Sequence, residues 1–175
     1  MQKDIRIQSR ISTSRLNLNI IHVNDYDFIE SLVNSKGWIE HIGDRNIHSK
    51  TDTIEYIDKI LGTENAFYWV VSIKETNTQI GITSLLKRNY LENFDIGFAF
   101  LPQFIGKGYA YEAAKAVLDM LSELPEFKTI LATTLFSNQN SIKLLTKLGF
   151  QFEKEIEIEN EKLHIYRNDK RIHQL

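Results

Sequence analysis

Hydrophobic and polar positions alternate along several stretches of the chain with the two-residue period of a β-strand. The stretch at 95–100 shows this most clearly, because Ile96, Phe98 and Phe100 alternate with small or acidic side chains. Pro102 ends that strand, since it cannot donate a hydrogen bond to a sheet. The other stretches predicted as strands are 16–20, 66–74, 79–86, 129–135, 150–158 and 163–166.

Between these strands, apolar residues recur every three or four positions, which is the spacing of one helical face. Asn24 is the predicted N-cap of the first helix, with Asp27 in the turn where the helix dipole favours negative charge. Ser49 or Thr51 is the predicted cap of the second helix, which stops at Gly62. The apolar faces of the predicted helices comprise Phe28, Ile29, Leu32 and Val33; Ile54, Ile57, Ile60 and Leu61; Ala110, Ala113, Ala114, Val117, Leu118 and Leu121; and Ile142, Leu144, Leu145 and Leu148.

The order of these elements predicts the fold class. The polar links at 75–78 and 88–93 are short, so the strands they join form an antiparallel meander. A long helix separates the strand at 95–100 from the strand at 129–135, which implies a parallel pairing by a right-handed crossover. We therefore expect a single α/β domain with a mixed, mostly antiparallel sheet over residues 12–168, and flexible termini at 1–11 and 169–175.

Composition narrows the function. The chain has 175 residues, enough for one domain with a sizeable core, and a formal charge of −2, so no broad basic field attracts nucleic acid or an anionic membrane. It contains no cysteine, which removes disulfides and thiolate catalysis and fits a cytoplasmic location. No signal region or membrane-spanning run is visible. The histidines show no metal-ligand spacing, so no metal is expected; they are His22, His41, His48, His164 and His173.

A loop rich in small residues joins the strand at 95–100 to the following helix. Its glycines, Gly106 and Gly108, let the backbone approach a ligand closely, and the first turn of a helix offers unpaired N–H groups to an anion. The loop therefore predicts a phosphate site, although a simple turn that needs small residues stays open. A P-loop fits poorly, because Tyr109 stands where Lys and Ser or Thr are needed, and a dinucleotide site fits poorly because of Tyr111.

Two segments resemble motifs of the GNAT acyl-CoA N-acyltransferases. The run 103–110 resembles their Q/R-x-x-G-x-G/A signature, and 138–150 resembles the N-x-x-S-x-x-x-x-x-K-L-G-F segment of the branch that includes the ribosomal-protein N-terminal acetyltransferases. The segments 13–16, 38–45 and 95–98 also resemble parts of that branch, and the likeness runs from about Ser12 to Arg167. The resemblance implies a central sheet that splays between its fourth and fifth strands, with helices on both faces.

The same resemblance implies acetyl-CoA as the acyl donor and an amine as the acceptor. The glycine loop then binds the pyrophosphate, and the strand at 98–100 pairs with the pantetheine arm and holds the thioester oxygen. Asn138 is at the family position that contacts pantetheine. The alternative, that Asn138 serves only as a helix N-cap, stays open. The expected coenzyme A contacts are Phe98, Ala99, Phe100, Gln103, Ile105, Gly106, Lys107, Gly108, Tyr109, Ala110, Asn138 and Ser141.

The reaction needs a group that accepts the proton of the amine and a group that protonates the departing thiolate. Asp95 is the expected acceptor, with Glu92 and Glu40 in reserve, and Ser141 is the expected donor, with Tyr166 behind it. Structural roles for Asp95 and Ser141 stay open. The expected acceptor wall comprises Trp38, Glu40, His41 and Arg45, and the acceptor cleft is expected between the segments 38–45 and 90–94.

The leading interpretation is an acetyltransferase that acts on a small-molecule amine by direct attack in a ternary complex. Two alternatives stay open, an enzyme that acetylates protein N-termini and a domain that binds acyl-CoA without turnover. Either a monomer or a homodimer is compatible with the sequence.

Overall fold

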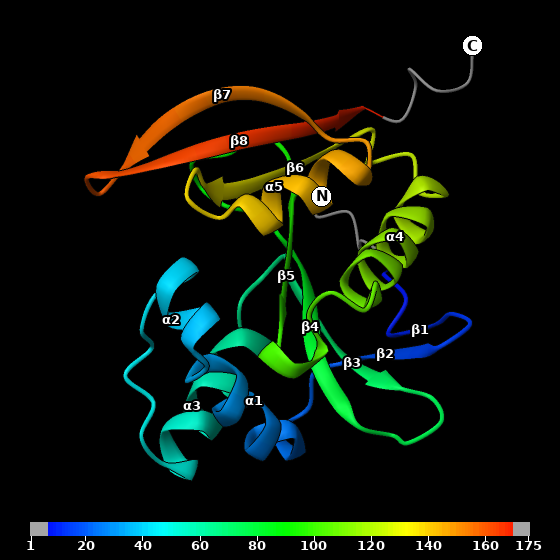
Figure 1. Cartoon of the computed structure of the whole chain (residues 1–175), viewed down its shortest axis with the longest axis vertical. Helices are drawn as coiled ribbons and strands as arrows, with labels where there is room; N and C mark the ends of the chain where they lie inside the picture. Colours follow the sequence, from blue (N-terminus) through cyan, green and yellow to red (C-terminus); the bar gives the residue numbers. More distant parts are fainter. Residues whose placement is uncertain (1–6, 170–175) are drawn as a thin grey trace.

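A computed structural model of the chain describes residues 7–169 (Figure 1). Within these residues, eight strands form one sheet in the order β1-β2-β3-β4-β5-β6-β8-β7. The strands are β1 (Arg10–Ser12), β2 (Leu16–Ile20), β3 (Ala66–Ile73), β4 (Gln79–Leu86), β5 (Asp95–Phe100), β6 (Thr129–Leu135), β7 (Gln151–Ile158) and β8 (Glu161–Asp169).

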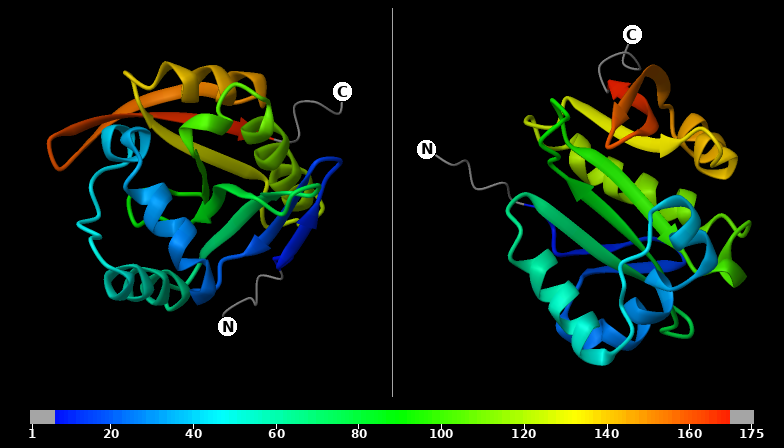
Figure 2. Two further views of the ribbon diagram at one scale, coloured as in Figure 1. Left: turned by 60° about the horizontal axis from the view of Figure 1, so that its bottom comes forward. Right: turned by 90° about the vertical axis from the view of Figure 1, so that its left-hand side faces the viewer.

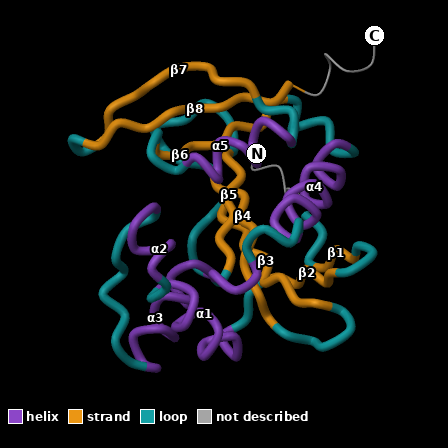
Figure 3. Tube along the Cα trace, in the orientation of Figure 1, coloured by secondary structure: helices purple, strands orange, loops and turns teal. Residues whose placement is uncertain are grey.

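Helices connect the strands and cover the sheet (Figure 3). The α-helices are α1 (Tyr26–Val33), α2 (Lys36–His41), α3 (Lys50–Leu61), α4 (Tyr109–Ser122) and α5 (Gln139–Lys147). Two short 3-10 turns, η1 (Val23–Asp25) and η2 (Pro102–Phe104), precede α1 and follow β5. In the described part of the chain, no helix has the length and apolarity needed to cross a bilayer.

The sheet changes character between β5 and β6. Strands β1 to β5 form an antiparallel meander, and β6, β8 and β7 form a second antiparallel group. The two groups meet in a parallel pair whose register contains only Asp95 opposite Leu131. Beyond this point β5 and β6 separate, and the second group runs in a different direction from β4 and β5 (Figures 1 and 2). The predicted parallel crossover and splayed sheet are thus confirmed.

Two apolar clusters hold the helices to opposite faces of the sheet. On one face, α4 and α5 pack on a cluster that includes the fully buried Trp69, whose Nε1–H donates to the Gln8 carbonyl at 2.9 Å. On the other face, α1, α2 and α3 enclose a second cluster that includes Ile29, Ile57 and Val70. Because neighbouring strand positions face opposite sides, the face that carries α1 to α3 also carries Asp95.

Several local predictions need correction. Leu61 was expected to face inward, but it is 50 % exposed because α3 ends there and its apolar face is completed by Ile57 and Ile60. Asn24 does not cap α1. The ring Nδ1 of His22 accepts the Asn24 N–H at 3.1 Å and thereby caps η1, and α1 begins only at Tyr26.

Other elements were not predicted at all. Strand β1 is three residues long, and α2 lies in the segment expected to be an irregular connector, because neither is long enough to show a period. Ser49 is the cap of α3, since its Oγ accepts the Asp52 N–H at 3.1 Å. Of the termini predicted to be flexible, 1–6 and 170–175, with His173, lie outside the described residues, whereas Arg10–Ser12 pairs with β2.

Candidate active site

Two glycines shape the turn between η2 and α4. Gly106 and Gly108 both have a φ of +79°, in the left-handed region that L side chains rarely adopt. Gly108 is the N-cap of α4 and has no side chain to satisfy the first turn. A Cβ placed on Gly106 would meet no heavy atom within 4 Å, so the space beside this turn is open.

The backbone of this turn presents a row of unpaired donors. Among residues 7–169, no hydrogen bond engages the N–H groups of residues 106–111, whereas the Glu112 N–H already donates to the Gly108 carbonyl at 3.1 Å. The Ile105 N–H, which was expected to be free, donates to the Pro102 carbonyl at 3.3 Å. Six consecutive free N–H groups at the positive end of a 14-residue helix form an anion site.

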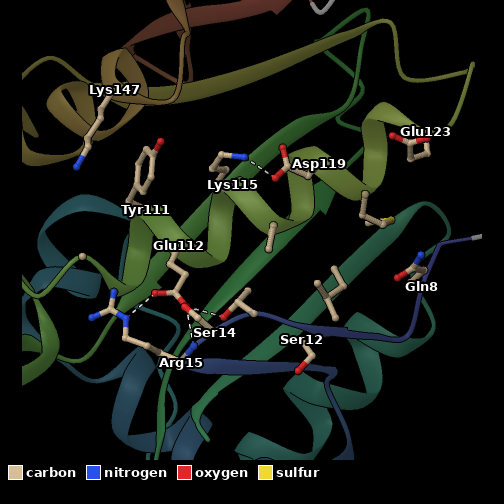
Figure 4. Close-up of a pocket in the computed structure, with 15 residues that line it drawn as sticks. Gln8, Ser12, Ser14, Arg15, Tyr111, Glu112, Lys115, Asp119, Glu123 and Lys147 are labelled. Carbon is tan, nitrogen blue, oxygen red and sulfur yellow. Dashed lines mark hydrogen bonds and ion pairs between the residues drawn. The ribbon is translucent and has the colours of Figure 1, made fainter.

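A brace from the N-terminal hairpin holds this helix end in place (Figure 4). One carboxylate oxygen of Glu112 accepts hydrogen bonds from the Thr13 and Ser14 hydroxyls and the Arg15 N–H, and the other accepts from Arg15 Nε at 2.6 Å. Arg15 also donates to the Lys107 carbonyl at 3.1 Å and lies over the Tyr109 ring. Burial opposes ionisation of Glu112, but these hydrogen bonds outweigh it and lower its pKa.

We expect Glu112→Gln to lower the stability of the protein and to weaken the binding of acetyl-CoA at the glycine turn. At neutral pH the free energy of unfolding should fall by about 1 kcal/mol, a modest cost because solvent screens a pair that includes the half-exposed Arg15. The KM for acetyl-CoA should rise about two- to fivefold, since Lys107 loses its brace. The lowered pKa means that the contribution of Glu112 is present above the ordinary glutamate pKa and is lost as pH falls.

Denaturant unfolding at neutral pH and at a series of lower pH values measures this effect, because the difference between the wild type and Glu112→Gln should shrink as the pH falls. Glu126→Gln, at an exposed loop position, is the matched control and should follow the wild type at each pH value. A gap between Glu112→Gln and wild type that is as large in acid as at neutral pH would contradict the ionic brace.

A surface cavity of about 860 Å³ lies along the flank of α4 that faces this hairpin (Figure 4). Its walls include Ser12, Glu112, Lys115 and Asp119. One end of the cavity, at Gly108 and Arg15, reaches the glycine turn. No residue of β5 or β6 lines the cavity. The cavity is therefore separate from the place where the two strands diverge.

Among residues 7–169, the edge of β5 beyond Asp95 has no strand partner on the β6 side. Leu131 N–H donates to the Phe94 carbonyl at 2.9 Å, and Leu101 N–H donates to the Ile80 carbonyl of β4 at 2.9 Å. Because backbone groups alternate between the two edges of a strand, Phe98 and Phe100 direct theirs toward the open edge and Ala99 directs its own toward β4. Phe98, Ala99 and Phe100 were predicted to pair with an extended ligand. Two of them, Phe98 and Phe100, present their backbone groups to the open edge.

Helix α5 begins at the C-terminal end of β6, opposite this open edge. Asn138 is its N-cap, since its Oδ1 accepts the Ser141 N–H at 3.1 Å. The cap uses the carbonyl oxygen of the side chain and leaves the amide NH₂ for a ligand, so capping and binding are compatible. Within residues 7–169, the Ser141 hydroxyl makes no hydrogen bond, whereas the alternative donor Tyr166 is buried in the core at 7 % exposure.

Asp95 lies where β5 and β6 part, on the face that carries α1 to α3. It is 2 % exposed, and Arg88 Nε–H donates to both of its oxygens at 3.0 Å. The Thr133 hydroxyl donates to one of them at 3.1 Å. Burial raises the pKa of Asp95, with Arg88 and Thr133 acting in the opposite direction.

The predicted acceptor wall follows α2. Trp38 is 5 % exposed, and its Nε1 and the Nδ1 of His41 are buried without a hydrogen-bond partner in the described structure. Arg45 lies over the Trp38 ring, 5.9 Å from the centroid, and Glu40 is exposed. No group of three His, Asp or Glu side chains among residues 7–169 is arranged to hold a metal.

The structure brings four further side chains to the same face, Tyr56, Tyr68, Arg88 and Tyr90. Of these, only Tyr90 was expected beside the acceptor from the sequence, at one end of the segment 90–94. Tyr68 is on β3 and pairs with Ser84 of β4, which pairs with Gly97, two residues beyond Asp95. A polar position within a strand rich in aromatic residues was the available signal for Tyr68, but nothing local indicated Tyr56 or Arg88.

Comparison with known proteins agrees with this geometry. The family model described as an acetyltransferase (GNAT) domain matches residues 15–151. The chain is 25 % identical over 143 residues to the uncharacterized N-acetyltransferase YnaD of Bacillus subtilis (strain 168), covering 82 % of this chain and 83 % of that protein.

Solved structures share the fold. The ribosomal alpha-N-protein acetyltransferase RimL in complex with coenzyme A superposes with a TM-score of 0.79 at 14 % identity, over 91 % of this chain and 97 % of the other. The spermidine N-acetyltransferase of Vibrio cholerae in complex with CoA and spermine gives a TM-score of 0.77 at 19 % identity, over 91 % and 98 %.

Since the family model spans well over half of the chain, the protein belongs to the GNAT acetyltransferase family. It is an acetyltransferase enzyme of a family that uses acetyl-CoA, and the resemblance stated from the two sequence motifs is confirmed. Its fold is the GNAT fold, with the mixed sheet that opens between β5 and β6.

Proposed function

We propose that the protein transfers the acetyl group of acetyl-CoA to the primary amine of a small molecule, by direct attack in a ternary complex. The observation that carries the proposal is the row of six unpaired N–H groups at the start of α4, beside the open edge of β5. A pyrophosphate and a peptide-like arm are the two parts of coenzyme A that these features fit.

Each part of the donor has residues that suit it. The N–H groups of residues 106–111 hold the pyrophosphate, with Gln103, Ile105 and the Lys107 cation at the turn. The backbone groups of Phe98 and Phe100 pair with the pantetheine arm, and the Asn138 NH₂ group donates to it from across the opening.

Acetyl-CoA supplies an activated acyl group as a thioester. The amine nitrogen forms the new C–N bond as the C–S bond breaks, so one proton must leave the nitrogen and one must reach the sulfur. Asp95 accepts the first through a water molecule, because its carboxylate is too buried to touch a bulky amine. The Ser141 hydroxyl, which has no other described partner, donates toward the sulfur.

A small acceptor is favoured by the enclosure of the face that carries Asp95. Side chains from α2, α3, β3 and the β4–β5 link converge there, and Trp38 is almost fully buried among them. RimL, by its name, acts on a protein N-terminus, so peptide acetylation is the second candidate. The charge of −2 gives no broad basic field to attract a nucleic-acid or membrane partner, and the absence of cysteine fits a cytoplasmic location. Either a monomer or a homodimer is compatible with this function.

Release of free thiol from acetyl-CoA, measured with amino acids, amino sugars, polyamines and N-terminal peptides, tests this function. We expect one class of small amine to be acetylated, with the product identified by mass spectrometry. Preferential acetylation of peptides would select the second candidate. Saturable binding of acetyl-CoA without thiol release from any acceptor would instead indicate a binding domain.

A further inference from the structure

Two guanidinium groups and three phenols lie near one another on the face that carries α1 to α3, beside Tyr68 and Asp95. They come from separate parts of the chain and form what we call the arginine–tyrosine cluster. Its members are Arg45 between α2 and α3, Tyr56 on α3, Tyr68 on β3, and Arg88 and Tyr90 in the link between β4 and β5.

Arg88 is anchored in a way that leaves donors available. Its Nε–H serves both oxygens of Asp95, so the ion pair occupies one of its five N–H groups. The guanidinium also lies 6.0 Å from the centroid of the Tyr90 ring. The Arg88 side chain is 37 % exposed whereas that of Asp95 is 3 % exposed, so the outer edge of the guanidinium faces solvent.

Arg45 has no neutralising partner. It lies over the Trp38 ring and near Tyr56, but it forms no ion pair with any carboxylate in the described residues 7–169. The planar donors of a guanidinium match a carboxylate or a phosphate.

The balance of charge in the cluster is positive. The ionised groups that act on Tyr68 are Arg88, Arg45 and Asp95, which gives two cations and one anion around one phenol. Burial raises the pKa of Tyr68 to about 12, so at neutral pH this phenol is uncharged and donates a hydrogen bond. The cluster thus offers donors and excess positive charge, an environment that favours an oxyanion and disfavours a polycation.

We infer that the acceptor is an amine that also carries an oxyanionic group, a carboxylate or a phosphate, which Arg45 binds together with the tyrosine hydroxyls and the outer edge of Arg88. The amine of the same molecule is then directed toward Asp95. This inference rests on the proposed acetyl transfer, and it separates the protein from the spermidine enzyme that shares its fold, whose substrate is a polycation.

Matched pairs of amines test the inference. L-alanine is compared with L-alaninamide, and O-phosphoethanolamine with ethanolamine, so that the first pair probes a carboxylate and the second a phosphate; spermidine represents a polycation. For the pair that matches the natural acceptor, we expect kcat/KM to be at least about tenfold higher with the anionic member. Alaninamide has the less basic amine, so a preference for alanine cannot arise from easier deprotonation.

Arg45→Gln should lower kcat/KM for the anionic amine about tenfold through KM, with kcat and the KM for acetyl-CoA little changed and the uncharged amine unaffected. Arg45→Lys should recover part of the loss, because it keeps the charge without the planar fork. Arg10→Gln, which removes an exposed arginine from β1, is the control and should match the wild type.

Calorimetric binding of the two anionic amines in the presence of CoA separates this inference from the proposed function. Binding that Arg45→Gln abolishes, without any thiol release, would support the anion site and reject the acetyl transfer. Three results would overturn the inference: no binding of either anion, a wild-type preference for spermidine or the uncharged amines, or an equal effect of Arg45→Gln on both members of a pair.

Discussion

Gly106→Glu should raise the KM for acetyl-CoA at least about 100-fold while the protein stays folded. The new carboxylate would lie beside the six free N–H groups and occupy the site of the pyrophosphate. Two like charges about 4 Å apart repel by about 4 kcal/mol at an effective dielectric constant of about 20, and every 1.4 kcal/mol corresponds to about tenfold in affinity. Titration calorimetry with CoA and steady-state kinetics both measure the change.

Gly106→Ala separates charge from backbone strain. It imposes the same unfavourable φ of +79°, at a cost of about 1–2 kcal/mol in stability, and its methyl group meets no atom within 4 Å. We therefore expect the alanine variant to bind CoA within about threefold of the wild type once folded. Equal losses in both variants would show that conformation of the turn, and not its anion site, controls binding.

Asp95→Asn should lower kcat/KM about 100-fold or more, because a positioned general base contributes about that much or more. Burial raises the pKa of Asp95 above the ordinary aspartate value. The acid limb of the wild-type profile of kcat/KM against pH should therefore lie above the range of an exposed aspartate, and it should be absent in Asp95→Asn. Asp58→Asn, at an exposed position on α3, is the control.

The same substitution has a consequence for stability. A carboxyl whose folded-state pKa is raised binds its proton more tightly in the folded protein, so its ionised form costs stability as pH rises through that pKa. Asp95→Asn removes this dependence but leaves Arg88 without its counter-charge, which should cost about 1–3 kcal/mol. If kcat/KM stays within about threefold of wild type and the acid limb persists, Asp95 serves only to hold Arg88.

More of the geometry around the glycine turn was visible in the sequence than of the geometry around Asp95. The glycine turn, the strand before it and the cap of α5 are each contained in one continuous segment, so their spacing is visible along the chain. Even there, one detail depended on geometry. The Ile105 N–H donates to the Pro102 carbonyl, and the row of free N–H groups extends from Gly106 to Tyr111 instead.

The acceptor side shows the opposite. Arg45 and Tyr90 were predicted from their segments, but Tyr56, Tyr68 and Arg88 were not, because each is locally an ordinary position on a helix, strand or link. Asp95 was selected as a proton acceptor from its strand position, yet its partner Arg88, whose Nε–H donates to both carboxylate oxygens, depends on how β4 returns to β5.

By itself the sequence determined the longer strands and helices, the order in which they follow one another, and the family to which the chain belongs. Each of these follows from local period, from turn residues or from motifs within one segment. Only the tertiary structure decided that the pairing of β5 with β6 is limited to one position, that Glu112 braces the glycine turn through Arg15, and that two arginines and three tyrosines share the face of the sheet that carries Asp95. These arrangements join residues far apart in the chain, and the packing of the sheet against its helices brings them together.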